Sequence, residues 1–189
     1  AFNLDLAPDL GYPEFADTWP HTNEWVMNTI SHNTVLVDKT AQSSQGVATP
    51  EHFDDSNFVK LIDVEAPEVY PSTQTCRRTT AMVKVDDENS YTIDLFRVKG
   101  GSDHLFSFHG AEGSVTSEGL NLADQAAGTY AGADVAFGVK PASDTTSGFG
   151  YTGPGFHWLK NVQKDTAPGK MFSVNWNVKD TWNIYGNGY

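Results

Sequence analysis

The sequence predicts an all-β chain, folded as an antiparallel β-sandwich of two stacked sheets. Three observations indicate this class. β-branched and aromatic residues gather in short runs, and turn-forming residues separate these runs at intervals of about 8–12 residues. No convincing helix longer than two turns interrupts them. Strands that follow one another without crossover helices are typical of antiparallel sandwiches and barrels.

The elements follow from local composition. Residues 1–28 are expected to form an irregular lead-in from a preceding domain, because prolines and a glycine cluster there, and residues 29–189 to form the sandwich. Residues 39–57 read as a polar loop, 86–89 as a tight hairpin turn and 119–127 as a short helix. The expected strands are 34–37, 58–65, 77–85, 90–98, 103–109, 135–139, 156–162, 172–178 and 182–185.

Composition limits the partners. The formal net charge of the 189 residues is -12, which repels nucleic acid and also disfavours an anionic polysaccharide unless a local cationic or metal site offsets it. No apolar run approaches the roughly 20 residues that span a bilayer, so no membrane partner is expected. Cys76 is the sole cysteine and is expected to be a small buried side chain rather than a reactive thiol. The chain opens at Ala1 without an initiator Met or a signal peptide, and we expect it to be a processed product or a piece of a longer protein.

The histidines are the candidate chemical groups. His32 begins the first expected strand, and an antiparallel second strand would bring Asp63 or Glu65 beside it. His109 ends the fifth strand and is a third donor, with His104 as its alternative. Two imidazoles and a carboxylate around an open position suit Zn²⁺. The competing interpretation is that these histidines are ordinary hydrogen-bonded or surface residues, as we expect for His21, His52 and His157.

Aromatic and basic side chains allow two interpretations as well. The five tryptophans can stack on sugar rings, but most tryptophans of a β-rich domain belong to its core. Arg77, Arg78 and Arg97 can pair with a substrate carboxylate, or be solvated or paired within the strands.

Several segments resemble heparinase II/III-like polysaccharide lyases, the group that includes heparin and alginate lyases. The resemblance covers about the first 110 residues, and the final part of the chain adds little to it. The segments are the lead-in 6–13, the His-Asn-Thr strand 31–38 followed by Gln42 or Gln45, the run 94–98 with Gly100-Gly101 and 103–110, and, more weakly, 64–70 with Arg77 and Arg78.

The resemblance implies the C-terminal β-sandwich of a two-part enzyme whose other half is an (α/α) toroid of helices. Such lyases cleave uronic-acid polysaccharides, including alginate and glycosaminoglycans, by β-elimination, with a Tyr and a His from the toroid and a His from the sandwich. This chain lacks the helical half, so alone we expect it to be inactive, with a helical domain or chain as its partner. The substrate class implies a secreted or periplasmic protein.

The resemblance also suggests site residues. His32 matches the strand histidine, which is catalytic in some relatives and a Zn²⁺ ligand in others. Relatives carry a second histidine two residues earlier, where this chain has Ile30, so one pair cannot fill both roles. We favour structural zinc bound by His32, Asp63 and His109. The candidate substrate contacts are Asn33, Tyr12 and Arg97.

Two other functions remain open. A non-catalytic carbohydrate-binding sandwich would expose aromatic residues on one face and bind sugar without forming product. A structural or interaction module would bind neither metal nor sugar, and would expose an apolar patch for its partner. Histidines at two strand ends favour the lyase, since a binding module does not need them.

Overall fold

The computed structural model describes residues 6–9 and 18–179. The chain divides into two compact units, one of Ala1–Thr34 with Phe106–Tyr189 and the other of Val35–Leu105. Strands β1 (Thr34–Val37) and β6 (His104–Ser107) pair with each other at this division. No helix within the described ranges is long and apolar enough to cross a membrane.

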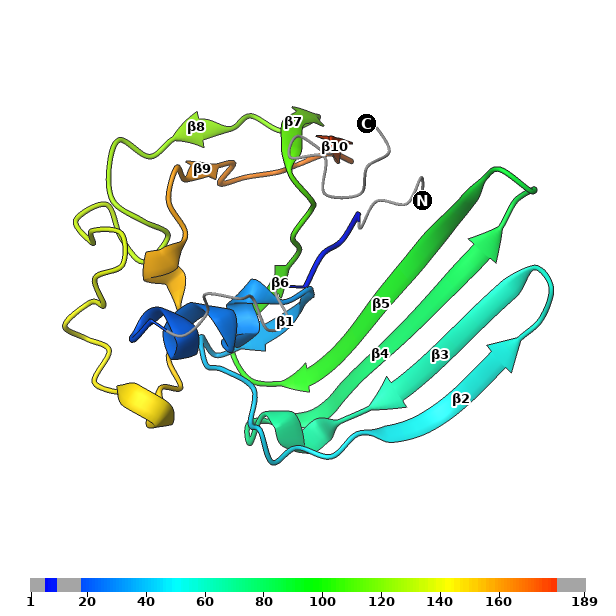
Figure 1. The fold of residues 1–189 in the computed structure, drawn as a ribbon, viewed down its shortest axis with the longest axis horizontal. Helices are drawn as coiled ribbons and strands as arrows, with labels where there is room; N and C mark the ends of the chain where they lie inside the picture. The colour runs from blue at the N-terminus through cyan, green and yellow to red at the C-terminus, as the bar shows by residue number, and fades with distance from the viewer. Residues whose placement is uncertain (1–5, 10–17, 180–189) are drawn as a thin grey trace. The chain divides into compact units, whose positions relative to one another are not determined.

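The unit Val35–Leu105 contains a four-stranded antiparallel sheet in the order β2-β3-β4-β5 (Figure 1). The turn 86–89 between β4 and β5 closes because the Asp86 carboxylate accepts hydrogen bonds from the backbone N–H groups of Glu88 and Asn89. A register shift interrupts the pairing of β2 with β3 between Pro50 and His52. The strand bounds are β2 (Thr49–Asp55), β3 (Val59–Glu65), β4 (Thr73–Lys84) and β5 (Ser90–Gly100).

The core of this unit lies at one end of the sheet. Val35, Val37 and Tyr70 are buried together, and the Tyr70 hydroxyl donates a hydrogen bond to the Val35 carbonyl at 2.8 Å. Tyr70 follows the short 3₁₀ turn η3 (Pro67–Val69). Just after β1, the Asp38 carboxylate accepts from the backbone N–H of Ser102 at 2.6 Å, and this bond lowers its pKa. Asp38 thereby fixes the turn between β5 and β6.

The other unit is built from short elements. A π-helical turn η1 (Thr22–Val26) and a 3₁₀ turn η2 (Thr29–Ser31) precede β1. Two small antiparallel pairs follow later in the chain, β7 with β10 and β8 with β9. Their bounds, with those of the remaining 3₁₀ turns, are β7 (Gly113–Glu118), β8 (Ala123–Asp124), η4 (Gly148–Gly150), η5 (Phe156–Trp158), β9 (Gln163–Lys164) and β10 (Ser173–Val178).

A buried hydrogen-bonded pair of side chains joins the beginning of this unit to its later part. Glu24 of η1 and His157 of η5 are 4% and 1% exposed, and Oε2 lies 2.8 Å from Nε2. Nearby, the Asn28 side chain donates to the Gly153 carbonyl at 3.0 Å. Gly155 has a φ of +67°, and a Cβ at this position would lie 2.5 Å from the Glu24 carbonyl oxygen. Glycine therefore allows the two segments to approach closely.

The predicted all-β antiparallel class is confirmed. Among its elements, the first, second and fourth strands and the hairpin turn occur where expected, as does the strand at 173–178. Residues 49–55 of the predicted loop form β2, and 113–118 form β7, which was not expected. Three predictions were wrong. The expected helix at 119–127 contains the short strand β8, the expected strand at 135–139 forms turns, and the expected strand at 156–162 begins with η5. The strand at 182–185 lies outside the described residues.

We predict that the Glu24–His157 pair is essential for the stability of its unit. Replacing Glu24 with Leu leaves the buried His157 without its hydrogen-bond partner and should lower the free energy of unfolding by ~1–3 kcal/mol. His157→Leu should cost a similar amount, and the double variant should cost less than the sum of the two. Urea denaturation of the four proteins measures this coupling. Strictly additive losses would show that the pair does not act as a unit.

Candidate histidine site

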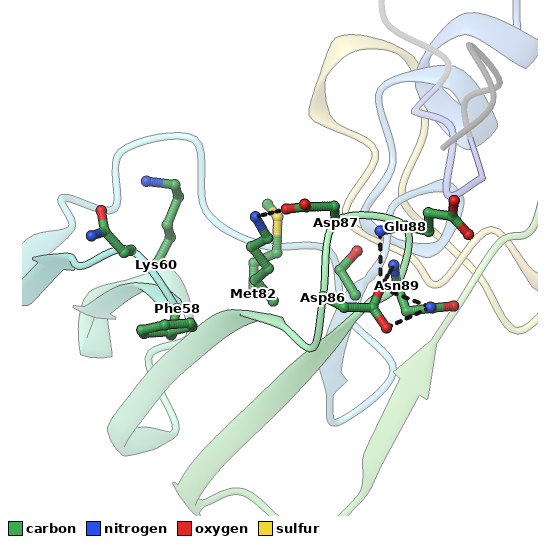
Figure 2. A pocket seen from close by; sticks show the side chains of 10 residues that line it. Phe58, Lys60, Met82, Asp86, Asp87, Glu88 and Asn89 are labelled. Atoms are coloured by element: carbon green, nitrogen blue, oxygen red, sulfur yellow. Dashed lines mark hydrogen bonds and ion pairs between the residues drawn. The ribbon is translucent and has the colours of Figure 1, made fainter.

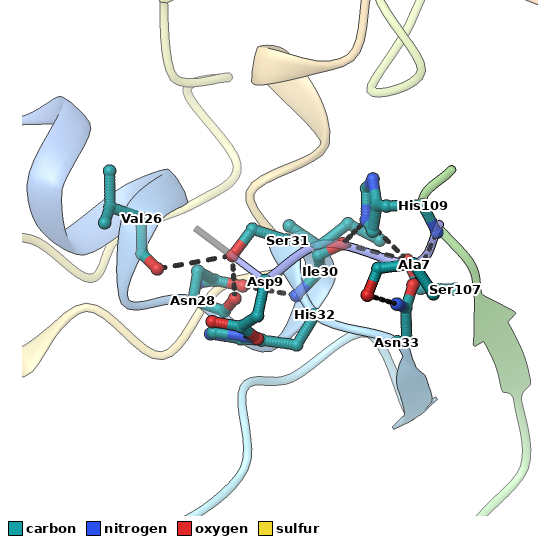
Figure 3. A network of polar contacts seen from close by, with 10 residues as sticks. All are labelled: Ala7, Asp9, Val26, Asn28, Ile30, Ser31, His32, Asn33, Ser107 and His109. Atoms are coloured by element: carbon teal, nitrogen blue, oxygen red, sulfur yellow. Dashed lines mark hydrogen bonds and ion pairs between the residues drawn. The ribbon is translucent and has the colours of Figure 1, made fainter. Parts of the chain in front are cut away.

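The segment before β1 carries a network of polar contacts that holds two of the predicted histidines (Figure 3). His32 Nδ1 lies 2.5 Å from Asp9 Oδ2. A carboxylate can only accept a hydrogen bond, so Nδ1 carries the hydrogen, and in the neutral ring Nε2 keeps its lone pair. The His32 side chain is 34% exposed. A carboxylate-oriented imidazole with an accessible second nitrogen is suited to proton transfer or ligand binding.

His109 has the opposite tautomer, because its other ring nitrogen meets an acceptor. Its Nε2 lies 2.7 Å from the Ile30 carbonyl oxygen and 3.1 Å from Ser107 Oγ, while Ser107 Oγ itself donates to that carbonyl at 2.8 Å. A carbonyl cannot donate, so Nε2 carries the hydrogen and Nδ1 has the lone pair in the neutral ring. The Trp25 ring meets the imidazole edge-on at 5.9 Å.

Asn33 organises the backbone of this site. Its Oδ1 accepts from the His109 N–H at 2.5 Å, and its Nδ2 donates to the Ala7 carbonyl at 3.4 Å. Both ends of the side chain therefore bind backbone, tying the lead-in and the β6 end to the segment before β1. A contact between Asn33 and substrate stays a prediction.

The turn η2 presents the Ile30 carbonyl to His109. Asn28 caps this turn, because its Oδ1 accepts from the Ile30 N–H at 3.2 Å. Ser31 Oγ donates back to the Asn28 carbonyl at 2.9 Å. Asn28 and Ser31 are buried, so their hydrogen bonds are shielded from water and fix the turn.

The unit Val35–Leu105 contains a separate cluster of charges around Asp63. Arg77 donates to both oxygens of this carboxylate, at 2.9 Å from Nε and 2.5 Å from Nη2. Thr79 Oγ1 adds a third hydrogen bond at 2.9 Å. Arg97, directly opposite Arg77 in the sheet, donates to Thr79 Oγ1 at 2.8 Å and lies 3.5 Å from Asp63. The Arg77 hydrogen bonds lower the pKa of Asp63 to about 2.

The predicted zinc ligands do not form a metal site among the described residues. Within 6–9 and 18–179, no three His, Cys, Asp or Glu side chains are grouped to hold a metal ion. β3 pairs with β2 and β4, whereas the prediction placed it beside β1. The Asp63 oxygens bind Arg77, and the alternative ligand His104 donates from Nε2 to the Gly100 carbonyl at 2.7 Å. Asp63 therefore does not fit the ligand set, and zinc binding stays a prediction.

A pocket of about 280 Å³ lies where the two hairpin turns of the four-stranded sheet meet (Figure 2). Phe58, Met82 and residues 86–90 contribute to its wall. Charged side chains of its wall interact with neighbouring groups. Lys84 donates to the Asp87 carboxylate at 2.6 Å, and the Asp86 carboxylate accepts from the backbone of its own turn. Lys60 pairs with Asp55. Both lysines that line this pocket are therefore paired with carboxylates, and neither is left to bind an anionic sugar.

Sequence reasoning missed several members of the histidine site. Asp9 was placed in a turn of the lead-in, and neither Ser107 nor the Ile30 carbonyl was expected to contact a histidine. The His-Asn-Thr segment was the available signal, because Asn33 follows His32 directly and links it to His109. Tyr12, a predicted substrate contact, lies outside the described residues.

We predict that Asp63 stabilises the folded state, and that this contribution is lost as the pH falls into the acid range. Its folded pKa of about 2 lies below the unfolded value near ~4, so the contribution is complete above pH ~4 and disappears as the pH falls toward 2. Asp63→Asn should lower the thermal midpoint at pH 7 and flatten its decline between pH 4 and 2. Melting curves across this range, with Asp54→Asn as the exposed control, measure the effect. Parallel pH profiles for wild type and Asp63→Asn would refute it.

Comparison with known proteins gives one match. The family model described as heparinase II/III-like, C-terminal, matches residues 3–166. Searches of curated proteins and of solved structures each found no significant match. The matched region includes the whole histidine network and the four-stranded sheet. The chain belongs to the heparinase II/III-like C-terminal family.

Proposed function

We propose that this chain is the β-sandwich part of a polysaccharide lyase that cleaves uronic-acid-containing polysaccharide by β-elimination. Membership of the heparinase II/III-like C-terminal family supports the substrate class. The observation that carries the proposal is the Asp9–His32 pair, because it supplies an oriented, accessible imidazole within the His-Asn-Thr segment.

The chemistry needs three functions. A base removes the weakly acidic proton from C5 of the uronate. The charge that develops next to the carboxylate is stabilised by positive or hydrogen-bonding groups. The C4–O bond then breaks as the C4–C5 double bond forms, and an acid protonates the leaving oxygen.

His32 is the proposed proton-transfer residue of this chain. The Asp9 carboxylate accepts the hydrogen of Nδ1 and orients the ring, so Nε2 can accept a proton from the substrate or return one to the leaving oxygen. Arg97 is a proposed contact for a uronate carboxylate. Its side chain is 57% exposed, and its guanidinium donates a hydrogen bond to Thr79 Oγ1.

The remaining catalytic groups belong, in this proposal, to a helical partner domain or chain. The partner supplies the Tyr and His that the resemblance implies, and the sandwich supplies His32. We place the reaction in the periplasm or outside the cell, where such polymers occur.

The test uses the full-length polypeptide that carries this chain. Alginate, heparan sulfate and hyaluronan are offered in turn, and absorbance of the conjugated double bond reports elimination. His32→Ala should lower kcat by ~10²–10⁴-fold, the range for loss of a general acid or base. Asp9→Asn should lower kcat less, because the amide oxygen of Asn can still accept the Nδ1 hydrogen and orient the ring.

His52→Ala is the matched control, because His52 is an exposed histidine on β2. It should leave kcat and KM unchanged. Elimination by the His32→Ala protein at the wild-type rate would remove His32 from the mechanism. Absence of elimination from every polyuronate with the full-length protein would overturn the lyase proposal itself.

A further inference from the structure

The basic residues of the two units differ in their partners. In the unit Val35–Leu105, every Lys and Arg except Lys99 forms an ion pair with a carboxylate, namely Lys39, Lys60, Arg77, Arg78, Lys84 and Arg97. In the other unit, none of the lysines pairs with a carboxylate among the described residues. These lysines are Lys140, Lys160, Lys164, Lys170 and Lys179. The cations that are left to attract an anion therefore lie mainly in this second unit.

Two of these lysines lie over aromatic rings. Lys160 Nζ is 4.8 Å from the centre of the Phe137 ring, and Lys164 Nζ is 5.3 Å from the centre of the Tyr130 ring. Both lysines are exposed. A ring face attracts an ammonium group and packs against its methylene stem, but unlike a carboxylate it does not neutralise the charge. Lys140 is bound differently, because its ammonium donates a hydrogen bond to a backbone carbonyl. Lys160 and Lys164 are therefore positioned by rings and remain cationic towards solvent.

Backbone pairing places both lysines along one short antiparallel ladder. In the pair of β8 with β9, Lys164 lies opposite Ala123 (Figure 1). An isolated bridge then pairs Lys160 with Thr129. Four residues of extended chain span at most about 14 Å, which limits the separation of the two lysine backbones. A uronic-acid polymer carries a carboxylate on every ring or every second ring, so one bound chain can present carboxylates to both ammonium groups.

The rings beneath the lysines are held by the 3₁₀ turn η5. Tyr130 meets Phe156 edge-on, with ring centroids 4.8 Å apart, and Phe137 meets Trp158 edge-on at 5.4 Å. Phe156 and Trp158 flank His157 in η5, and Phe156 is buried. Edge-to-face contacts are a favoured geometry of aromatic pairs. The positions of the two ammonium groups therefore depend on packed rings and not on the lysine side chains alone.

The carboxylates nearest to the two lysines in the ladder bind other groups. Asp165 follows Lys164 directly and accepts hydrogen bonds from two backbone N–H groups, at 2.8 and 2.9 Å. These bonds lower its pKa. Asp124 accepts from the side-chain amide of Gln163 at 2.8 Å. Neither carboxylate forms an ion pair with a lysine in the described part of the chain. The hydrogen-bond donors of Lys160 and Lys164 are thus left for an external anion.

These lysines provide the local cationic site that an acidic chain needs in order to bind an anionic polymer. A net charge of -12 repels such a polymer at long range, so binding requires positive charge at the point of contact. We propose that Lys160 and Lys164, held over Phe137 and Tyr130, form a subsite for carboxylates of the polysaccharide. Each ammonium donates charge-assisted hydrogen bonds to a uronate carboxylate. This inference rests on the proposed function for its substrate class, and it adds binding residues that the proton-transfer step does not use.

The test measures binding separately from elimination. The full-length protein carrying His32→Ala is the parent, because elimination by it should be slow, and calorimetry measures its Kd for alginate. Adding Lys160→Gln or Lys164→Gln should each raise Kd by about twofold to fivefold at low salt, the range for one exposed ion pair, and adding both by about tenfold. The difference from the parent should shrink at high salt. It should vanish with methyl-esterified alginate, whose carboxyl groups carry no charge. Lys160→Arg should retain the affinity, because the cation over the ring remains.

Lys170→Gln is the matched control, because it removes the same charge from an exposed lysine outside the ladder of β8 and β9. It should leave Kd unchanged. Circular dichroism and melting curves confirm that each variant folds. Unchanged Kd in folded Lys160→Gln and Lys164→Gln proteins would overturn the subsite and leave the proposed function intact. An equal rise of Kd in Lys170→Gln would also overturn it, because net charge alone would then explain the loss. A wild-type full-length protein that binds no polyuronate would contradict the proposed function together with the subsite.

Discussion

The buried pair between Glu24 and His157 is the constraint on which the histidine site depends. It joins residues that lie far apart in the chain. Both side chains are buried, so solvent cannot take the place of a lost partner. Asn28 adds a hydrogen bond to the same later segment and also caps η2. These contacts hold the turn that presents the Ile30 carbonyl to His109. The orientation of the His109 imidazole therefore depends on residues that lie outside the strands β1 and β6.

The two histidines illustrate how one backbone can prepare side chains for different tasks. A carboxylate orients His32, whereas a backbone carbonyl orients His109. In the neutral rings the lone pair is therefore on Nε2 in His32 and on Nδ1 in His109. Asn33 couples the two by binding the His109 N–H immediately beside His32.

The parts of the fold that sequence could predict are those with strong local signals. The β4–β5 hairpin alternates residue types and contains an acidic turn, so its register followed from local chemistry. β2 was missed because Pro50, His52 and three acidic residues give it low β propensity, and pairing with β3 overrides that preference. His32 and His109 were found as strand-end residues. Asp9 and the Glu24–His157 pair were not, because contacts between distant segments leave no local pattern.

The two outer strands of the four-stranded sheet differ in how they resist self-association. β2 has a proline without an N–H, a register shift and a row of carboxylates, all of which oppose the addition of another strand. β5 is longer and regular, with Tyr91, Ile93 and Leu95 exposed. No strand among the described residues pairs with its outer edge, so its backbone groups there offer a continuous template for a foreign β-strand. Aggregation of this chain, when it occurs, should therefore begin along β5, and a single charged or proline residue introduced there should improve solubility more than any change along β2.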